Sequence, residues 1–182
     1  ARENNCRSHI DGARIFNASI SSSLSPKRMA REYDSISVCL SKGLGAPVGS
    51  VLVGSTETLY KAHRWRKMFG GGMRQAGVLA AAGIYSLENN IDRLSEDHDR
   101  AMEIATALDR MDSYEVDLEQ VQTNMVYVKC DKGGAEALIS RLERMGIQAL
   151  TIDSSTIRIV THLHITDDDV QRTISALDSA QL

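Results

Sequence analysis

The 182-residue sequence lacks the features that mark nucleic-acid-binding and membrane proteins. It has no excess of one charge, because 21 basic residues are balanced by 24 acidic ones and the formal net charge is -3. A protein that binds nucleic acid or an anionic lipid surface usually carries a basic patch, so neither partner is expected. No apolar run approaches the roughly 20 residues that a membrane-spanning helix needs. We therefore expect no membrane association, and a small-molecule partner.

Cysteine is scarce, and its spacing argues against a structural metal site. Cys6, Cys39 and Cys130 are odd in number and form no CxxC pair. Such a pattern is typical of free thiols in a reducing compartment. We expect a cytoplasmic protein without bound metal, with a mitochondrial location left open.

The apolar content of 42% is enough to bury a sizeable core. The first residues carry no initiator Met and run at once into residues 9–12 (HIDG), which read as a strand and the turn after it. A strand that opens a chain has lost whatever preceded it. We therefore expect this sequence to be a fragment of a longer protein.

Residues 1–112 read as an α/β arrangement. Short strands are predicted at 35–40 and 49–53, on the two sides of a glycine-containing loop. A helix capped by Ser55 or Thr56 should stop at the glycines of residues 70–72. The next helix, from Met73 to about Tyr85, is nearly all small and apolar, so we expect it to be buried and to allow close backbone approach. It should continue as an amphipathic helix to Leu108.

After Asp112 the pattern changes to a compact α+β unit. Thr166 is a good N-cap for its last helix, with three aspartates at the positive end of that helix. The predicted elements are strands at 124–129, 147–151 and 156–160, helices at 135–145 and 167–177, and a turn at 131–134.

Lys42 is the first candidate for chemistry. It follows a strand and precedes residues 43–47 (GLGAP), whose glycines allow a tight turn. Removal of a lysine from water lowers its pKa and frees the amine to form a Schiff base with a carbonyl group. The alternative is a surface lysine in a loop, which the local sequence alone favours.

Asp11 is the second candidate. It ends an earlier strand, where an open α/β sheet places ligand-binding groups. A carboxylate there could keep a pyridine nitrogen protonated, and a protonated ring is the electron sink of pyridoxal chemistry. The alternative is that Asp11 only caps the next turn and pairs with Arg14.

Four segments taken together resemble low-specificity L-threonine aldolases. Residues 8–14 (SHIDGAR) resemble the family's His-Xaa-Asp-Gly-Ala-Arg signature, and residues 41–50 (SKGLGAPVGS) resemble its lysine signature. Residues 70–75 (GGGMRQ) resemble its glycine-rich segment before a helix, and residues 158–162 (RIVTH) its C-terminal strand. The chain thus looks like the C-terminal portion of such an enzyme, without the N-terminal half.

The resemblance implies an α/β fold: the C-terminal part of the fold-type I pyridoxal-phosphate large domain, with a mostly parallel sheet, plus a small α+β domain. Residues 1–85 would belong to the large domain, residues 86–112 would form a connecting helix, and residues 113–182 would form the C-terminal domain.

The resemblance also implies roles for five residues. Lys42 would carry pyridoxal 5'-phosphate, Asp11 would contact its pyridine nitrogen, and Arg14 would lie beside cofactor and substrate. Arg158 would bind the substrate carboxylate, for which a guanidinium fork with two parallel donors is suited. Arg74 would approach the cofactor phosphate at a helix N-terminus; its alternative is a solvated arginine in the first helical turn.

The histidines and the single tryptophan are given lesser roles. His9 would pack against or orient Asp11 without taking part in the chemistry. His162 and His164 would share a face at the end of a strand, with nothing to specify a metal. Trp65 would mark an interface or a solvated helix face.

The implied activity is reversible retro-aldol cleavage of L-threonine or L-allo-threonine to glycine and acetaldehyde. A base, which this sequence does not identify, would take the β-hydroxyl proton while the Cα–Cβ bond breaks. A homodimer or homotetramer with shared sites is expected, and the fragment alone should be inactive without the N-terminal half. The alternatives are another fold-type I activity, such as a β-eliminating lyase or an aminotransferase, and an inactive fragment or assembly subunit.

Overall fold

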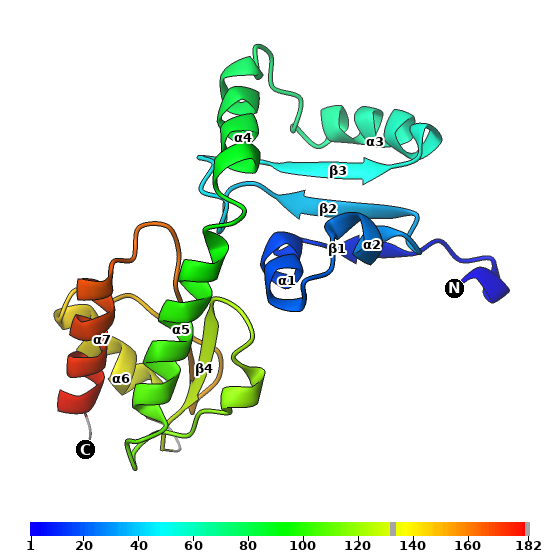
Figure 1. The fold of residues 1–182 in the computed structure, drawn as a ribbon. Coiled ribbons are helices and arrows are strands. Elements are labelled where there is room, and N and C mark those ends of the chain that lie inside the picture. The colour runs from blue at the N-terminus through cyan, green and yellow to red at the C-terminus, as the bar shows by residue number, and fades with distance from the viewer. Residues whose placement is uncertain (132–133, 181–182) are drawn as a thin grey trace. The chain divides into compact units, whose positions relative to one another are not determined.

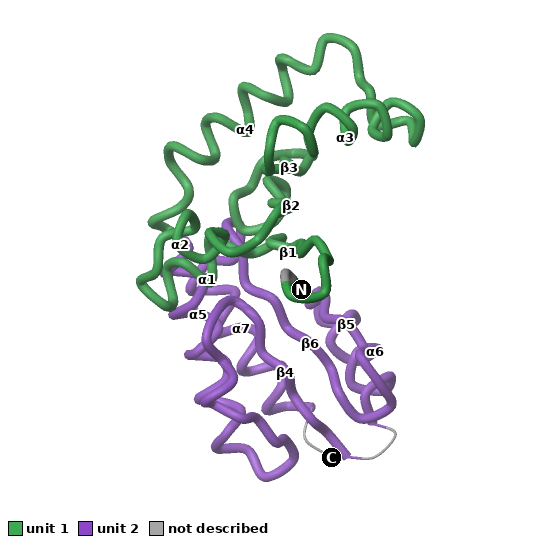
Figure 2. The backbone as a smooth tube through the Cα atoms, turned by 90° about the vertical axis from the view of Figure 1, so that its right-hand side faces the viewer, with its two compact units in different colours: residues 1–93 green, residues 94–182 purple. Residues whose placement is uncertain are grey.

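The computed structural model describes residues 1–131 and 134–180. These residues form two compact units, 1–93 and 94–182, drawn in green and purple in Figure 2. The division between Arg93 and Leu94 falls inside residues 86–112, which the sequence analysis predicted to be a connecting helix. The predicted division into residues 1–85, 86–112 and 113–182 stays a prediction. Nowhere in the described ranges is a helix long and apolar enough to cross a membrane.

The first unit contains a three-stranded sheet in the order β1-β2-β3 (Figure 1). Strand β1 (His9–Asp11) pairs in parallel with β2 (Ser35–Cys39), and β2 pairs antiparallel with β3 (Ser50–Gly54). One of the two pairings in this unit is therefore parallel and the other is antiparallel. The cause is the short connection between β2 and β3, because a parallel crossover needs about a dozen residues or more and usually a helix.

The helices of the first unit begin and end at local signals. Ser55 caps α3 as predicted, since its Oγ accepts a hydrogen bond from the Thr58 N–H at 3.2 Å. Helix α3 ends just before Gly70, whose φ of 81° is unfavourable for other residues. The four α-helices are α1 (Ile15–Ser22), α2 (Pro26–Ala30), α3 (Thr56–Met68) and α4 (Gly77–Asn89), and a short 3-10 turn, η1, spans Arg2–Asn4.

Helix α4 corrects two predictions and confirms a third. It is not buried in this chain, because Val78 is 70% exposed and Tyr85 is 63% exposed. It also ends at Asn89 and does not continue into the amphipathic helix. Close approach does occur at Gly83, where an added Cβ would lie 2.9 Å from Leu40 Cδ1. A small residue is therefore needed on the one face of α4 that meets the end of β2.

The second unit is the predicted α+β arrangement. Its sheet has the order β4-β6-β5, with both pairings antiparallel. The predicted strand at 147–151 shrinks to two residues, and the predicted turn at 131–134 includes residues 132–133, which lie outside the described part. The elements are α5 (Leu94–Leu108), η2 (Leu118–Gln120), β4 (Met125–Lys129), α6 (Ala135–Arg144), β5 (Leu150–Thr151), β6 (Thr156–Val160) and α7 (Asp167–Ser179).

One face of the second sheet packs on helices and forms the core of this unit. Val126 and Val128 of β4 and Ile157 of β6 are fully buried, and they share a cluster with Ile104 of α5 and Leu177 of α7. Burial of such side chains contributes about 1.5–3 kcal/mol each. These side chains therefore form the hydrophobic core of this unit.

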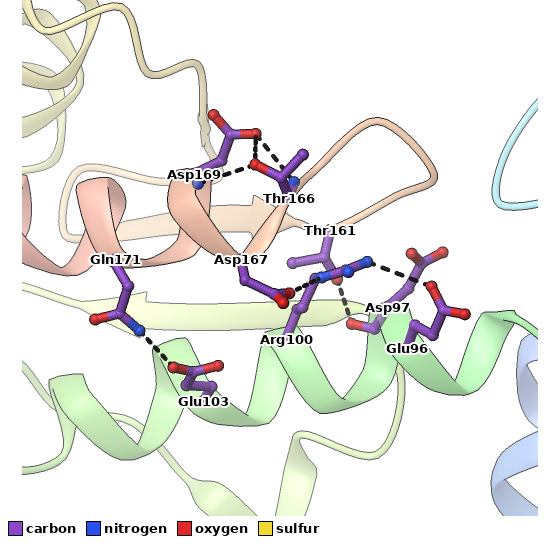
Figure 3. Close-up of polar contacts among 9 residues, drawn as sticks. All are labelled: Glu96, Asp97, Arg100, Glu103, Thr161, Thr166, Asp167, Asp169 and Gln171. Carbon is purple, nitrogen blue, oxygen red and sulfur yellow. Dashed lines mark hydrogen bonds and ion pairs between the residues drawn. The ribbon is translucent and has the colours of Figure 1, made fainter.

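Polar contacts tie α5 to the start of α7 (Figure 3). Thr166 and Asp169 form a capping box, because Thr166 Oγ1 accepts from the Asp169 N–H and Asp169 Oδ2 accepts from the Thr166 N–H. The predicted N-cap is thus confirmed. Arg100 of α5 donates from Nε to Asp167 Oδ1 at 2.8 Å, and this bond raises the pKa of Arg100.

Candidate active site

Asp11 and Lys42 lie at the same edge of the first sheet. Asp11 is the last residue of β1, and Lys42 follows the end of β2, the strand that pairs in parallel with β1. The carboxyl ends of parallel strands meet at one edge, which is where open α/β sheets bind ligands. The fold therefore gathers the two principal candidates from segments that are far apart in the sequence.

The loop that carries Lys42 has a fixed backbone. The Lys42 carbonyl accepts a hydrogen bond from the Gly45 N–H at 2.8 Å, and Gly45 has a φ of 75°. The Leu40 carbonyl accepts from the Ala46 N–H at 3.0 Å. Leu44 is only 3% exposed, so its side chain anchors the loop. The sequence analysis predicted that the glycines after Lys42 allow a tight turn, and the conformation of Gly45 confirms this.

The Lys42 side chain is exposed, which differs from the expected lysine removed from water. No described residue holds its ammonium group in a hydrogen bond or an ion pair. A side chain loses water only when other groups cover it, and in this chain the buried Leu44 secures the loop backbone without covering the lysine. Lys42 is thus placed on a loop with a defined turn, and its side-chain nitrogen is unpaired among the described residues.

Asp11 is held by the turn that follows it. Its Oδ1 accepts a hydrogen bond from the Ala13 N–H at 3.1 Å, so the capping half of the alternative interpretation is correct. No ion pair joins Asp11 to Arg14 in the described ranges, and the pairing half of that interpretation is not met. Oδ2 accepts no bond from a described residue. One carboxylate oxygen of Asp11 therefore remains available to a hydrogen-bond donor of a ligand.

Gly12 fixes the distance between β1 and β2 beside Asp11. Its N–H donates to the Ser37 carbonyl at 2.8 Å. A Cβ at this position would lie 2.6 Å from Ile36 Cδ1 and 2.9 Å from the Ser37 carbonyl oxygen. Only glycine permits so close an approach, which explains this residue of the SHIDGAR segment.

Arg14 and Arg158 share an unusual feature. The Nε atom of each is buried and has no hydrogen-bond partner among the described residues. A buried donor without an acceptor costs about 1–3 kcal/mol. Two of the arginines that the sequence analysis assigned to anionic ligands thus each lack an acceptor that a ligand carboxylate or phosphate could supply.

Arg158 lies on β6, the central strand of the second unit. Tyr127 of β4 and Leu150 of β5 are its partners in register, and both are exposed. Its neighbours Ile157 and Ile159 are buried in the core. Because side chains alternate along a strand, Arg158 projects from the face of the sheet opposite the core.

Arg74 and His9 have surroundings that differ from those expected. Arg74 lies in a turn before α4, because that helix starts only at Gly77 after Gln75 with a φ of 49°. Its side chain is exposed. The Nδ1 atom of His9 lies 2.9 Å from Ser35 Oγ of the neighbouring strand. A direct hydrogen bond from His9 to Asp11 is not among its contacts.

The remaining candidates do not form a metal site. Strand β6 ends at Val160, so His162 and His164 lie in the segment after the strand and not on it; their rings are 5.8 Å apart, edge to face. Across residues 1–131 and 134–180, no group of three or more His, Cys, Asp or Glu side chains could hold a metal ion.

Trp65 is exposed and stacks on Phe69, with the two ring centroids 5.8 Å apart.

Comparison with known proteins gives the family of the chain that carries this sheet edge with its lysine and aspartate. The beta-eliminating lyase family matches residues 1–131, and the chain belongs to this family. It is 45% identical over 185 residues to low-specificity L-threonine aldolase 1 of Arabidopsis thaliana, covering 100% of this chain and 52% of that protein. It is 45% identical over 169 residues to the low specificity L-threonine aldolase of Escherichia coli K12, covering 93% and 49%.

The fold also agrees with a solved structure. The threonine aldolase of Leishmania major superimposes with a TM-score of 0.78 at 17% identity, over 100% of this chain and 54% of that one. This likeness confirms the fold class that the sequence analysis predicted. The chain spans about half the length of the curated relatives that it matches.

Proposed function

We propose that this chain forms the C-terminal part of a pyridoxal-phosphate enzyme that reversibly cleaves L-threonine and L-allo-threonine to glycine and acetaldehyde. The observation that carries the proposal is that Asp11 and Lys42 lie at the same edge of a parallel strand pair. Each lies within a segment that resembles a signature of the aldolases. The relatives at 45% identity bear aldolase names, which favours this activity over others in the family.

The residues present fit pyridoxal 5'-phosphate. Lys42 offers a side-chain nitrogen that no described residue engages, Asp11 offers an unused carboxylate oxygen for the ring nitrogen, and Arg14 offers a buried donor that lacks an acceptor among the described residues. When bound, the cofactor withdraws the electrons released at the amino acid's Cα. The charge of Asp11 would hold a proton on the ring nitrogen and so favour that withdrawal. Arg74 would approach the phosphate.

Arg158 would bind the substrate carboxylate. Its guanidinium is always charged and can give two parallel hydrogen bonds to a carboxylate. The Nε without an acceptor supports this assignment, because a bidentate carboxylate commonly uses that atom. Binding through the carboxylate leaves the β-hydroxyl end of the amino acid free to meet a base.

Exposed apolar residues indicate that further protein covers the first unit. Val51, Leu52 and Val53 follow one another on β3 and are all exposed, at 43%, 37% and 51%. Successive residues of a strand point to opposite faces, so both faces of β3 are uncovered. We propose that the half found in the relatives but not in this chain covers β3, and that the enzyme is a homodimer or homotetramer. The free cysteines fit a reducing compartment such as the cytoplasm.

Borohydride reduction of the full-length enzyme with its cofactor tests the proposal. The phosphopyridoxyl label should map to Lys42, and Lys42→Ala should abolish both the label and nearly all turnover. Lys61→Ala is the matched control, since Lys61 is also exposed but forms an ion pair with Glu57. A label on Lys61, Lys67 or Lys129 in the unmodified enzyme would show the assignment to be wrong.

Product analysis separates the proposed reaction from its alternatives. Threonine should give acetaldehyde and glycine in equal amounts. A keto acid in their place would indicate an aminotransferase or a β-eliminating lyase. Absence of both products together with absence of bound cofactor would indicate an inactive assembly subunit.

A further inference from the structure

Helix α4 holds the Lys42 loop at two places. Gly83 brings the helix close to Leu40, the residue after β2. At the end of the helix, the Asn90 side chain donates from Nδ2 to the Leu44 carbonyl at 2.8 Å. Leu44 stands two residues after Lys42, so this bond joins the helix end to the middle of the loop.

The Asn90 bond differs from the other hydrogen bonds of the loop. The bonds from Gly45 to Lys42 and from Ala46 to Leu40 are local and set the shape of the turn. They do not fix where the turn sits on the unit. Asn90 comes from 46 positions away and is part-buried. Its bond can therefore fix the position of the turn against α4.

We propose that Asn90 is a positioning residue that sets the direction in which Lys42 projects from the sheet edge. This inference rests on the proposed attachment of the cofactor to Lys42. The amide donates to a carbonyl whose own side chain is buried, so the bond is partly shielded from water and is stronger than an exposed one. Without it, the loop keeps its turn but gains freedom relative to Asp11 on β1.

The neighbouring residue supplies a matched control. Asn89 also donates from Nδ2 to a carbonyl at 2.8 Å, but its acceptor is Tyr85, one turn back in the same helix. Asn90→Asp and Asn89→Asp each replace one amide by a carboxylate of nearly the same size at the end of α4. Only the first change removes a donor that reaches the lysine loop.

The first measurement is hydrogen exchange of residues 40–49 in the full-length protein without cofactor. Asn90→Asp should speed exchange at Gly45 and Ala46 about fivefold, which corresponds to the loss of one hydrogen bond. Asn89→Asp should leave this segment unchanged. Asn90→His, whose ring N–H can reach about as far as the amide, should restore most of the protection.

The second measurement uses the enzyme with its cofactor. Asn90→Asp should lower kcat about tenfold or more, because misplacement of a reacting group weakens catalysis strongly, while KM for threonine changes less than twofold. The pH at which the absorbance of the lysine-bound cofactor changes should also shift. Asn89→Asp should match the unmodified enzyme in all three values.

The outcomes decide separately on the two proposals. The positioning role would be overturned if Asn90→Asp had the same hydrogen-exchange rates in residues 40–49 as the unmodified protein and the same pH dependence of cofactor absorbance. If Asn90→Asp does not fold, Asn90→Ala takes its place. If neither variant folds, Asn90 is a structural residue and the positioning role is overturned as well. A borohydride label on another lysine would overturn the proposed function, while loop exchange without cofactor would still show whether Asn90 holds the loop.

Discussion

A side chain at position 12 would collide with the strand beside β1, and this collision allows a quantitative prediction. An added Cβ would lie 2.6 Å from Ile36 Cδ1 and 2.9 Å from the carbonyl oxygen of Ser37. The end of the Ile36 side chain can rotate away. The Ser37 carbonyl is backbone and is held in the strand pairing, so β1 must move away from β2.

The expected cost of Gly12→Ala follows from two terms. Overpacking of a tight site costs about 1–3 kcal/mol. Separation of the strands also weakens the 2.8 Å bond from the Gly12 N–H to Ser37, which contributes about 1 kcal/mol. We therefore expect a loss of about 2–4 kcal/mol in the free energy of unfolding. Because Asp11 precedes Gly12, cofactor affinity should fall as well.

Denaturant unfolding and cofactor titration of the full-length protein measure both effects. Gly77→Ala is the control, because Gly77 starts α4 and an added Cβ there would meet nothing within 4 Å apart from its chain neighbours and its own helix backbone. That change should be neutral or stabilising by up to about 1 kcal/mol. Gly12→Ala within about 0.5 kcal/mol of the unmodified protein, with unchanged cofactor affinity, would refute the reasoning, since changes of that size are ordinary surface effects.

Three further predictions concern single side chains. Asp11→Asn should keep the cofactor bound but lower kcat by about a hundredfold or more, because an amide does not stabilise a ring cation as a carboxylate does; unchanged turnover would remove Asp11 from the site. Arg158→Lys should weaken threonine binding by about 1–3 kcal/mol through loss of the two-point contact, and an unchanged apparent affinity would place the carboxylate elsewhere. The hydrogen bonds from Thr166 lower the pKa of Asp169, so the stability they contribute is present above the ordinary pKa of aspartate and is lost as the pH falls through the lowered value. The difference in unfolding free energy between the unmodified protein and Asp169→Asn should therefore shrink on acidification from pH 7 to 3, and a constant difference would contradict this.

Sequence reasoning succeeded where structure depends on nearby residues. Strand β6 matches its predicted bounds, Ser55 and Thr166 cap their helices, and α3 stops before Gly70. It failed for α1, which was not predicted. Six of its eight residues are Ile, Asn or Ser, which have modest helix propensity, and its formation depends on burial of Ile15.

The candidate site was also predicted in part. The sequence placed Asp11 and Lys42 at strand ends, and the parallel pairing of β1 with β2 brings these ends to one edge of the sheet. The surroundings of Arg74 and His9 could not be read from the sequence, since both depend on where neighbouring segments lie. The contribution of Asn90 was missed, because it acts over 46 positions and belongs to no motif.

The sequence by itself therefore determined which reactive groups are present and where two helices begin. The groups are a lysine in a glycine-rich turn and an aspartate and an arginine on either side of Gly12. These follow from residue types at fixed short spacings, where backbone geometry leaves few choices. Only the tertiary structure decided which side chains are covered. It left α4 exposed, left Lys42 in water, and gave Arg14 and Arg158 a buried nitrogen that no acceptor of the described residues meets. Burial depends on every segment that packs around a residue, and no short stretch of sequence contains that information.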